Sequence, residues 1–317
     1  LVVGLFGTLA LTAVLYSFQD YDVVAWDPGR LIRFFFWKIN PGGPGDPKAR
    51  RDRIERELGL LGAHRWAGRY YEGNGHDRSV SIEAAPGAGF TFSRSWGNGR
   101  DIHQDGEVEE VEPGRLRLNP HIMPWEYAPT GLPLDVHVVP WGDRVYLIPP
   151  EDLLAFANAV NSGSEPRYDS PSRFLIREGG IDIPVTGFPA LPESHKRYLL
   201  PSPITARVLR TGAQRDGKTE ILVDAGRQQG LIEGMELVSQ GDLYGTAEIT
   251  TVRERESVAL FGPLPNRPSV LPVGLRLGTR FPEYQHWSSS DDPLRIVVKR
   301  FGRNYPKYEL VLAPLRV

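Results

Sequence analysis

The stretch Arg65-Trp66-Ala67-Gly68-Arg69-Tyr70-Tyr71 decides how the first half of the chain is interpreted, because apolar and polar residues alternate along it. The same period of two recurs in Ser79–Glu83 and in Gly89–Phe92. It returns in Leu116–Leu118 and in Leu134–Val138, and turn residues separate all these segments. Alternation of this kind is typical of a strand with one buried face. Several such strands in succession predict an antiparallel barrel or sandwich.

Helical patterns flank these strands. Lys48–Leu61 and Glu151–Ala159 carry apolar residues at helical spacing, and a glycine follows each of them at a place where a helix can end. The polar segment Asn161–Arg167 is expected to cap the second of these helices. Residues 164–200 are rich in Pro, Gly and Ser and are expected to be irregular. We therefore place a first β-rich domain at residues 47–200.

Residues 201–317 again have the pattern of strands, and they are predicted to form a second β-barrel-like domain. The expected strands are Ile204–Leu209, Thr219–Val223, Met235–Val238, Gly245–Val252, Ser257–Phe261, Leu275–Phe281, Leu294–Lys299 and Tyr308–Leu312.

Part of this second domain resembles a known barrel. The segments Ile221–Gly226, Gly230–Met235, Gly245–Ile249 and Ser257–Leu260 give a strand, a D-x-G, a GL-x-x-GM turn and two further strands. Over residues 218–262 this resembles the small β-barrel of the rod-shape-determining protein MreC and the C-terminal domains of flagellar assembly proteins. Those families are bacterial envelope proteins that bind other proteins and are not enzymes. The resemblance therefore implies a role in protein binding.

The first domain resembles a different family. Its Trp66-Ala67-Gly68-Arg69-Tyr70 is similar to the W-x-G-x-Y opening strand of lipocalin-like barrels, in which the aromatic residue closes one end and the glycine allows a bend. The resemblance implies an alternative function, the transport of an apolar ligand such as a lipid. Side chains that fill the same interior would leave only a packed core. The residues expected to line or close the cavity are Trp66, Tyr70, Phe90, Phe92 and Trp125.

The beginning of the sequence predicts a membrane anchor. Leu1–Gln19 has no charged residue, and 19 residues in a helix span about 28 Å, close to the bilayer core of about 30 Å. A signal peptide that is later removed is the alternative.

Residues 20–46 are predicted to be a juxtamembrane segment and linker. Cations flank their aromatic run, which suits a membrane interface, while a helix that packs on the first domain is the alternative. The run consists of Phe34, Phe35, Phe36 and Trp37.

Residues Gly212–Thr219 match the nucleotide-binding pattern G-x-x-x-x-G-K-[ST]. Phosphate binding there requires a helix directly after the motif, because the N–H groups at the start of that helix hold the phosphates. The following Glu220–Asp224 is short and rich in β-formers. We therefore predict a hairpin, with a strand over 204–211, a turn and a return strand.

Residues Asp101–Glu112 resemble a calcium loop, with acidic residues at loop positions 1, 5, 7, 9 and 12 and a glycine at position 6. Metal binding would then use Asp101, Asp105, Glu107 and Glu112. However, His103 stands where Asp or Asn is usual, and neither flank has a helical pattern. The favoured alternative is a hairpin with an Asp105-Gly106 turn and with its acidic residues facing water.

Composition excludes several classes of protein. The 37 Lys and Arg against 39 Asp and Glu give a net charge of −2, which argues against a partner such as nucleic acid. The absence of Cys excludes thiol nucleophiles, disulfides and Cys-ligated metals. The seven His residues show no metal-binding spacing, and no esterase or dinucleotide motif is present. We predict no cofactor, no metal and no catalytic residue, while an enzymatic activity stays open.

Together these observations predict a mainly β chain, with an N-terminal transmembrane helix followed by two β-rich domains and a few short helices. The expected function is that of a non-enzymatic scaffold of a bacterial envelope. A single pass would hold the chain in the inner (cytoplasmic) membrane, with the soluble part in the periplasm. Expected partners are the membrane, other envelope proteins or a second copy, with residues 204–262 as the docking surface.

Overall fold

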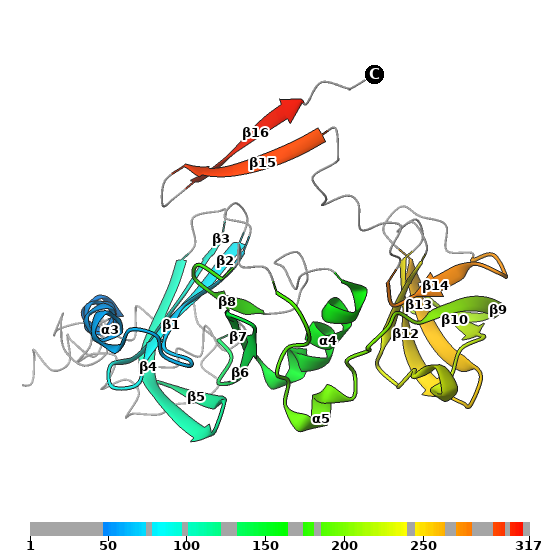
Figure 1. Ribbon diagram of the computed structural model, residues 1–317, viewed down its shortest axis with the longest axis horizontal. Helices are drawn as coiled ribbons and strands as arrows, with labels where there is room; N and C mark the ends of the chain where they lie inside the picture. Colours follow the sequence, from blue (N-terminus) through cyan, green and yellow to red (C-terminus); the bar gives the residue numbers. More distant parts are fainter. Residues whose placement is uncertain are drawn as a thin grey trace, which may run out of the picture.

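The computed structural model describes residues 47–73, 78–96, 101–121, 132–163, 174–180, 185–239, 245–263, 271–280, 294–301 and 305–312. The fold is mainly β, with two closed antiparallel barrels and a few short helices (Figure 1). The predicted anchor at 1–19, the segment 20–46 with Phe34–Trp37, and Trp125 lie outside the described residues. Within the described ranges, no helix has both the length and the apolar character that a bilayer crossing requires.

The first barrel has eight strands in sequence order, and each pairs antiparallel with the next. The barrel is closed by β8, which pairs with both β7 and β1 and sets Ile176 opposite Tyr71. Its strands are β1 (Gly68–Gly73), β2 (Arg78–Ala85), β3 (Gly89–Trp96), β4 (Asp101–Glu112), β5 (Arg115–Pro120), β6 (Asp135–Trp141), β7 (Arg144–Ile148) and β8 (Leu175–Arg177).

The predicted irregularity of residues 164–200 is therefore wrong at β8. This strand has three residues, so it is too short to display a period of two. It forms because Leu175 and Ile176 are buried on opposite faces of the sheet, the first in the barrel interior and the second under a helix. Closure of the barrel thus depends on a segment without a clear local signal.

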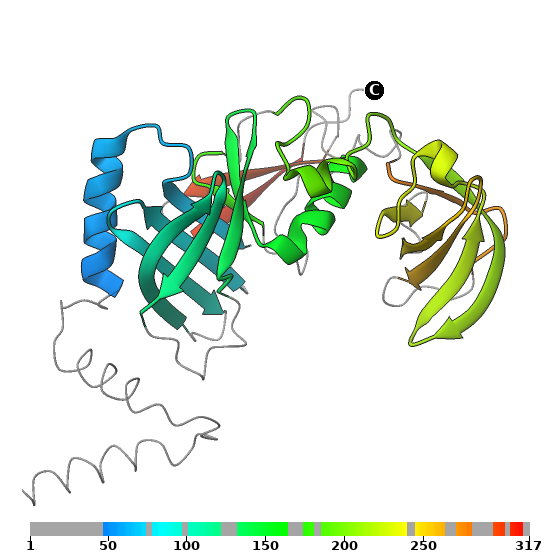
Figure 2. The same ribbon diagram turned by 90° about the horizontal axis from the view of Figure 1, so that it is seen from below.

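Two helices cover the outside of this barrel (Figure 2). Helix α3 (Pro47–Leu61), predicted at 48–61, packs on β2, β3 and β4 through Ile54, which is fully buried. Helix α4 (Leu153–Ser162) follows the 3-10 turn η2 (Pro150–Asp152) and packs its Phe156 on outward-facing aromatic residues of β6 and β7. It ends at Gly163, whose φ of 71° is left-handed, as the sequence predicted. The short helix α5 (Glu193–Lys196) begins the connection to the second barrel.

The second barrel has six strands in the order β10-β13-β12-β11-β14-β9, and β9 pairs with β10 to close it. The predicted strands over residues 204–278 are confirmed, although β9 runs to Arg215 where the prediction ended at Leu209, and β14 is shorter than the predicted Leu275–Phe281. A 3-10 turn, η3 (Arg227–Gln229), follows β10. The strands are β9 (Thr205–Arg215), β10 (Lys218–Val223), β11 (Glu236–Ser239), β12 (Gly245–Val252), β13 (Ser257–Pro263) and β14 (Arg276–Gly278).

The motif at Gly212–Thr219 forms a hairpin, as predicted. Asp216 and Gly217 occupy its turn with φ values of 50° and 76°. Two positive φ values in succession are typical of a tight turn between antiparallel strands. No helix follows the motif, because Lys218 opens β10 directly. The backbone therefore lacks the helix start on which phosphate binding by this motif depends.

The last two strands, β15 (Leu294–Phe301) and β16 (Tyr305–Leu312), form a two-stranded sheet of their own. They pair antiparallel along their whole length, from Leu294 with Leu312 to Phe301 with Tyr305.

Candidate functional site

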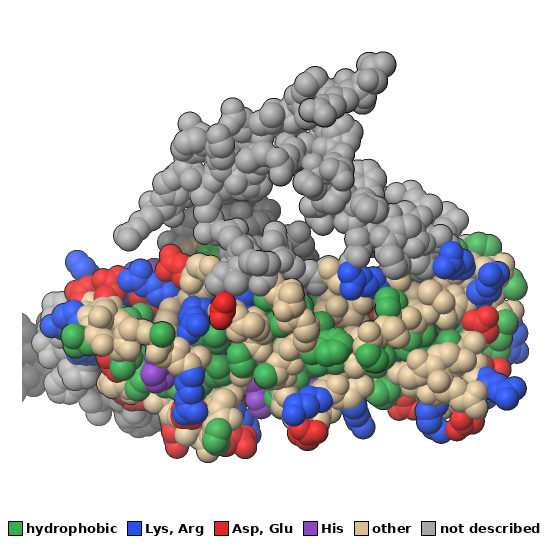
Figure 3. Space-filling model, in the orientation of Figure 1, with side chains coloured by type: hydrophobic (Ala, Val, Ile, Leu, Met, Phe, Trp, Pro, Cys, Tyr) green, Lys and Arg blue, Asp and Glu red, His purple; other side chains and the backbone are tan. Residues whose placement is uncertain are grey.

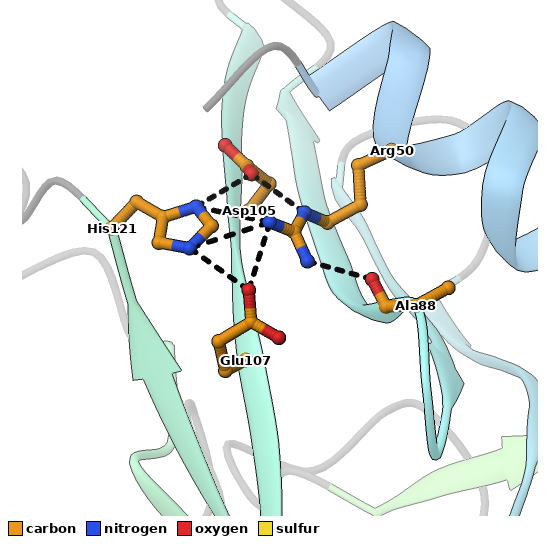
Figure 4. A network of polar contacts seen from close by, with 5 residues as sticks. All are labelled: Arg50, Ala88, Asp105, Glu107 and His121. Carbon is orange, nitrogen blue, oxygen red and sulfur yellow. Dashed lines mark hydrogen bonds and ion pairs between the residues drawn. The ribbon is translucent and has the colours of Figure 1, made fainter. Parts of the chain in front are cut away.

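A buried ionic cluster joins α3 to the first barrel (Figure 4). Arg50 of α3 is 4% exposed, and its Nε lies 2.9 Å from Oδ2 of Asp105 on β4. Its Nη2 lies 3.0 Å from Oε1 of Glu107, and its Nη1 donates a hydrogen bond to the carbonyl oxygen of Ala88 at 2.7 Å. His121, at the end of β5, lies within 3.1 Å of both carboxylates. Each of the three guanidinium nitrogens thus lies within 3.0 Å of an oxygen atom.

The cluster is structural in character. A buried charge costs free energy unless it is paired and hydrogen-bonded, and the two carboxylates meet that requirement for Arg50. The guanidinium also occupies the space between the two carboxylates, where a cation would have to bind. Within the ranges that the structure describes, no group of three or more acidic or His side chains is arranged to hold a metal ion.

The sequence contained a signal for Arg50 that the pattern analysis missed. Arg50 stands four residues before Ile54, and Leu58 follows four residues later, so all three lie on one face of α3. A cation on the apolar face of a helix requires a buried anion as partner. Asp105 supplies that anion, since it is 5% exposed on the neighbouring strand.

The residues of the calcium-loop hypothesis lie on one extended strand, because Asp101–Glu112 forms β4 without interruption. A loop curls its ligands around a single point, whereas a strand sends successive side chains to opposite faces. The loop geometry is therefore contradicted, and so is the alternative turn at Asp105-Gly106. Asp105 is buried against Arg50, while Glu107 and Glu112 are 55% and 57% exposed, as the water-facing interpretation expected.

Gly106 has a different physical role from the predicted turn. A Cβ atom at this position would lie 2.1 Å from the carbonyl oxygen of Asn119 and 2.6 Å from Cε1 of Phe90. Glycine is therefore needed because β5 and an interior aromatic ring approach the backbone closely. A glycine in a strand pattern marks either a turn or a close approach, and only the fold distinguishes the two.

The structure brings four of the five predicted cavity residues together in the interior of the first barrel. Trp66, Tyr70, Phe90 and Phe92 are between 0% and 4% exposed and belong to one hydrophobic cluster. The Tyr70 hydroxyl donates a hydrogen bond to the carbonyl oxygen of Trp66 at 2.6 Å, and burial raises the pKa of that hydroxyl well above its usual range. These side chains pack against one another and against aliphatic residues of the neighbouring strands.

Trp66 lies just before β1, at the same end of the barrel as the turn between β4 and β5. Its Nε1 donates a hydrogen bond to Oε2 of Glu110 at 3.2 Å, and Arg65 forms an ion pair with the same carboxylate. Glu110 in turn accepts a hydrogen bond from the backbone N–H of Gly114 at 3.0 Å. Trp66 therefore lies beside the turn between β4 and β5, held there by Glu110.

A joint between the two barrels is the feature that the sequence missed. Asn158 of α4 donates from Nδ2 to the carbonyl oxygen of Gly234 at 3.1 Å, and its Oδ1 accepts from the N–H of Glu236 at 3.3 Å. Both backbone groups belong to the second barrel. Gly234 also comes so close to the helix that a Cβ there would lie 2.6 Å from Cδ2 of Leu154. Helix α4 therefore packs directly on the second barrel.

Asn161 extends the joint one turn further along α4. Its Nδ2 donates to the carbonyl oxygen of Tyr198 at 2.7 Å, and its Oδ1 accepts from the N–H of Leu200 at 2.9 Å. The expected capping of α4 by this segment comes from Gly163 and Ser162, while Asn161 bonds to the connection between the barrels. Beside this joint, burial and the nearby Glu248 raise the pKa of Glu236. Asn158 and Asn161 are three residues apart, so they lie on one face of α4.

Comparison of the chain with protein-family models, with curated proteins and with solved structures yields no match.

Proposed function

We propose that this chain is a membrane-anchored, non-enzymatic protein of the bacterial envelope that acts as a scaffold or interaction module. In this proposal residues 1–19 form a single-pass anchor in the inner membrane, and the barrels lie in the periplasm. The partners are other envelope proteins or a second copy. The observation that carries the proposal is the packed aromatic interior of the first barrel, which favours a structural role over a cavity for a ligand.

The way in which such a scaffold would bind a partner follows from barrel closure. Closed barrels have no free strand edges, so strand addition to either barrel is disfavoured. Docking then relies on exposed side chains. Large apolar side chains that stay exposed on the second barrel include Leu209 at 46% and Val273 at 67%. The proposed docking surface at residues 204–262 contains the first of these.

The joint at α4 supports the same role. A scaffold must hold its binding surfaces at a defined separation, and the four hydrogen bonds of Asn158 and Asn161 link α4 to the second barrel and to its connection. The order of strands, D-x-G and glycine turns in residues 218–262 is also compatible with the resemblance to the MreC barrel. That resemblance is what adds the envelope and the protein partners to the proposal.

The experiment is membrane fractionation of cells that express the full chain with a C-terminal tag. The proposal expects the chain in the membrane pellet after carbonate washing, and digestion of the tag by protease added to spheroplasts. Crosslinking in the same cells is expected to give discrete protein adducts. Recovery of the chain in the soluble fraction, or a tag that protease reaches only after lysis, would overturn the anchor or its orientation.

A further inference from the structure

The strands β15 and β16 form a sheet that is separate from both barrels (Figure 1). Among the strands that the structure describes, neither of these two pairs with a strand of the first or the second barrel. A two-stranded sheet on its own is only marginally stable in water, because it buries little apolar surface. The β15–β16 sheet therefore requires a further surface against which its apolar residues can pack.

The register of the pair divides its residues between two unlike faces. Residues that lie opposite each other in an antiparallel pair belong to the same face, and the face changes at every step along a strand. One face, named here the apolar face, consists of Leu294, Ile296, Val298, Arg300, Pro306, Tyr308, Leu310 and Leu312. The opposite face consists of Arg295, Val297, Lys299, Phe301, Tyr305, Lys307, Glu309 and Val311. The sheet is thus amphipathic.

The two strands are also basic, although the whole chain has a net charge of −2. Their cations are Arg295, Lys299, Arg300 and Lys307, and their one acidic residue is Glu309. The register places Lys299 directly opposite Lys307. Over the face of the barrels that Figure 3 draws, by contrast, basic and acidic side chains are intermixed. The charge of the β15–β16 sheet therefore favours an anionic partner and opposes a second copy of the same sheet.

We propose that the β15–β16 sheet binds an anionic lipid surface, with its apolar face at the boundary between the headgroups and the acyl chains. Aromatic residues beside cations are typical of membrane interfaces. Phe301 directly follows Arg300, and Lys307 directly precedes Tyr308. The inference goes beyond the proposed scaffold function, and it does not require the anchor, because this contact uses only residues of the sheet.

The sheet would lie along the membrane surface. An open two-stranded sheet cannot cross a bilayer, since its outer edges would lack hydrogen-bond partners in the hydrocarbon. Each strand has eight residues and so extends over about 26 Å. With the apolar face turned to the acyl chains, the lysines of the opposite face lie at the level of the lipid phosphates, as in interfacial amphipathic helices.

Strand addition by a protein is the poorer explanation. Lys, Arg and Pro on an outer strand are features that protect a free edge from pairing. Here Arg295 and Lys299 occur on β15, while Pro306 and Lys307 occur on β16. An acidic protein surface would match the charge alone, whereas a bilayer also offers an apolar layer next to its phosphates.

The experiment exploits the absence of Cys from the chain, which allows a fluorescent NBD label at one introduced cysteine. The full chain labelled at Val298→Cys, on the apolar face, is incorporated into vesicles of phosphatidylglycerol with phosphatidylcholine, and in parallel into phosphatidylcholine alone. The label is expected to brighten and to shift its emission to the blue in the anionic vesicles only. Val297→Cys is the matched control, because this neighbouring residue lies on the opposite face, and its emission should change much less.

A charge reversal tests the anionic requirement. Lys299→Glu, combined with the label at Val298→Cys, sets a carboxylate opposite Lys307, so the pairing of the strands is preserved. It is expected to lower the ratio of bound to free sheet about tenfold or more at the same phosphatidylglycerol content. Arg255→Glu changes an exposed arginine in the turn between β12 and β13 and should leave the ratio unchanged.

Several outcomes would overturn the inference. They include equal emission changes at residues 297 and 298, no change in the anionic vesicles, and equal losses in the two charge variants. A response in detergent alone that grows with protein concentration would replace the lipid by a second copy. A response to polyglutamate but not to phosphatidylglycerol would replace it by an acidic protein. The label reports on the sheet alone, so this proposal and the one tested by fractionation fail separately.

Discussion

Nε of Arg50 lies 2.9 Å from Oδ2 of Asp105, and both side chains are 5% exposed. This pair fixes the amino-terminal helix of the described chain on the outer wall of the first barrel. It also gives Asp105, one of the acidic residues of the calcium-loop pattern, a partner within the chain, on a segment that forms the strand β4. One carboxylate is turned inward to a cation of the same chain, and Glu107 and His121 complete the cluster.

Removal of the Arg50 charge is predicted to destabilise the first barrel. Arg50→Met leaves Asp105 buried without its cation, and loss of one partner of a buried pair costs about 3–5 kcal/mol. The free energy of unfolding in urea measures the loss. As a control, Arg227→Ala removes one partner of the Arg227–Glu254 pair, which is about two-thirds exposed, and it should cost less than about 1 kcal/mol. Equal effects of the two variants would contradict the account of the cluster.

Gly106→Ala is predicted to be destabilising by about 1–3 kcal/mol, because its Cβ would meet the backbone of β5 and the ring of Phe90. Gly59→Ala, in α3, provides the control. A Cβ there has no atom within 4 Å, so the change should stabilise the helix by about 0.5–1 kcal/mol. Thermal unfolding of both variants tests the close approach, and a neutral Gly106→Ala would argue for a looser barrel.

Local pattern was sufficient for most of the strands. Gly245–Val252 coincides with the predicted segment, and the Gly212–Thr219 motif was recognised as a hairpin from the β-formers behind it. Such features are encoded by neighbouring residues, through alternation and turn chemistry. The same reasoning failed at β8 and at Gly106, since barrel closure and interior space depend on residues from distant strands.

The contacts of polar side chains were the least predictable part of the candidate site. Asn158 looks like a neutral helix residue, yet both ends of its amide bond to the second barrel. Trp66 and three other aromatic residues were correctly grouped, because an opening-strand pattern and alternation both point into one barrel. Whether an aromatic interior is packed or hollow depends on the volume of many side chains, which a pattern of alternation does not contain.

The Asn158→Leu variant is predicted to loosen the joint between the barrels. The carbonyl of Gly234 and the N–H of Glu236 lose their partner, at a cost of about 1–3 kcal/mol. Small-angle scattering should then show a broader distribution of distances between the barrels, while each barrel stays folded. Asn119→Ala, an exposed asparagine on β5, serves as the control and should leave the scattering curve unchanged.

Acidification is predicted to destabilise the first barrel through His137. Burial, with a smaller effect of Arg115, lowers the pKa of His137 below 6.5 in the folded state. The unfolded chain therefore binds more protons between the two pKa values, so stability rises with pH through that window and falls as pH drops below about 6.5. Melting temperatures between pH 7.5 and pH 5 should fall less for His137→Gln than for the wild type. Parallel curves would rule out this source of pH dependence.

The central claim, that the chain is a scaffold and carries no ligand, is tested most directly by native mass spectrometry of the full chain released from detergent. The account predicts the bare protein mass, alone or in discrete assemblies with itself or with co-purified proteins. A bound small molecule of a few hundred daltons that is lost on denaturation would contradict it. That result would show that the interior around Tyr70 and Phe92 opens to hold an apolar ligand.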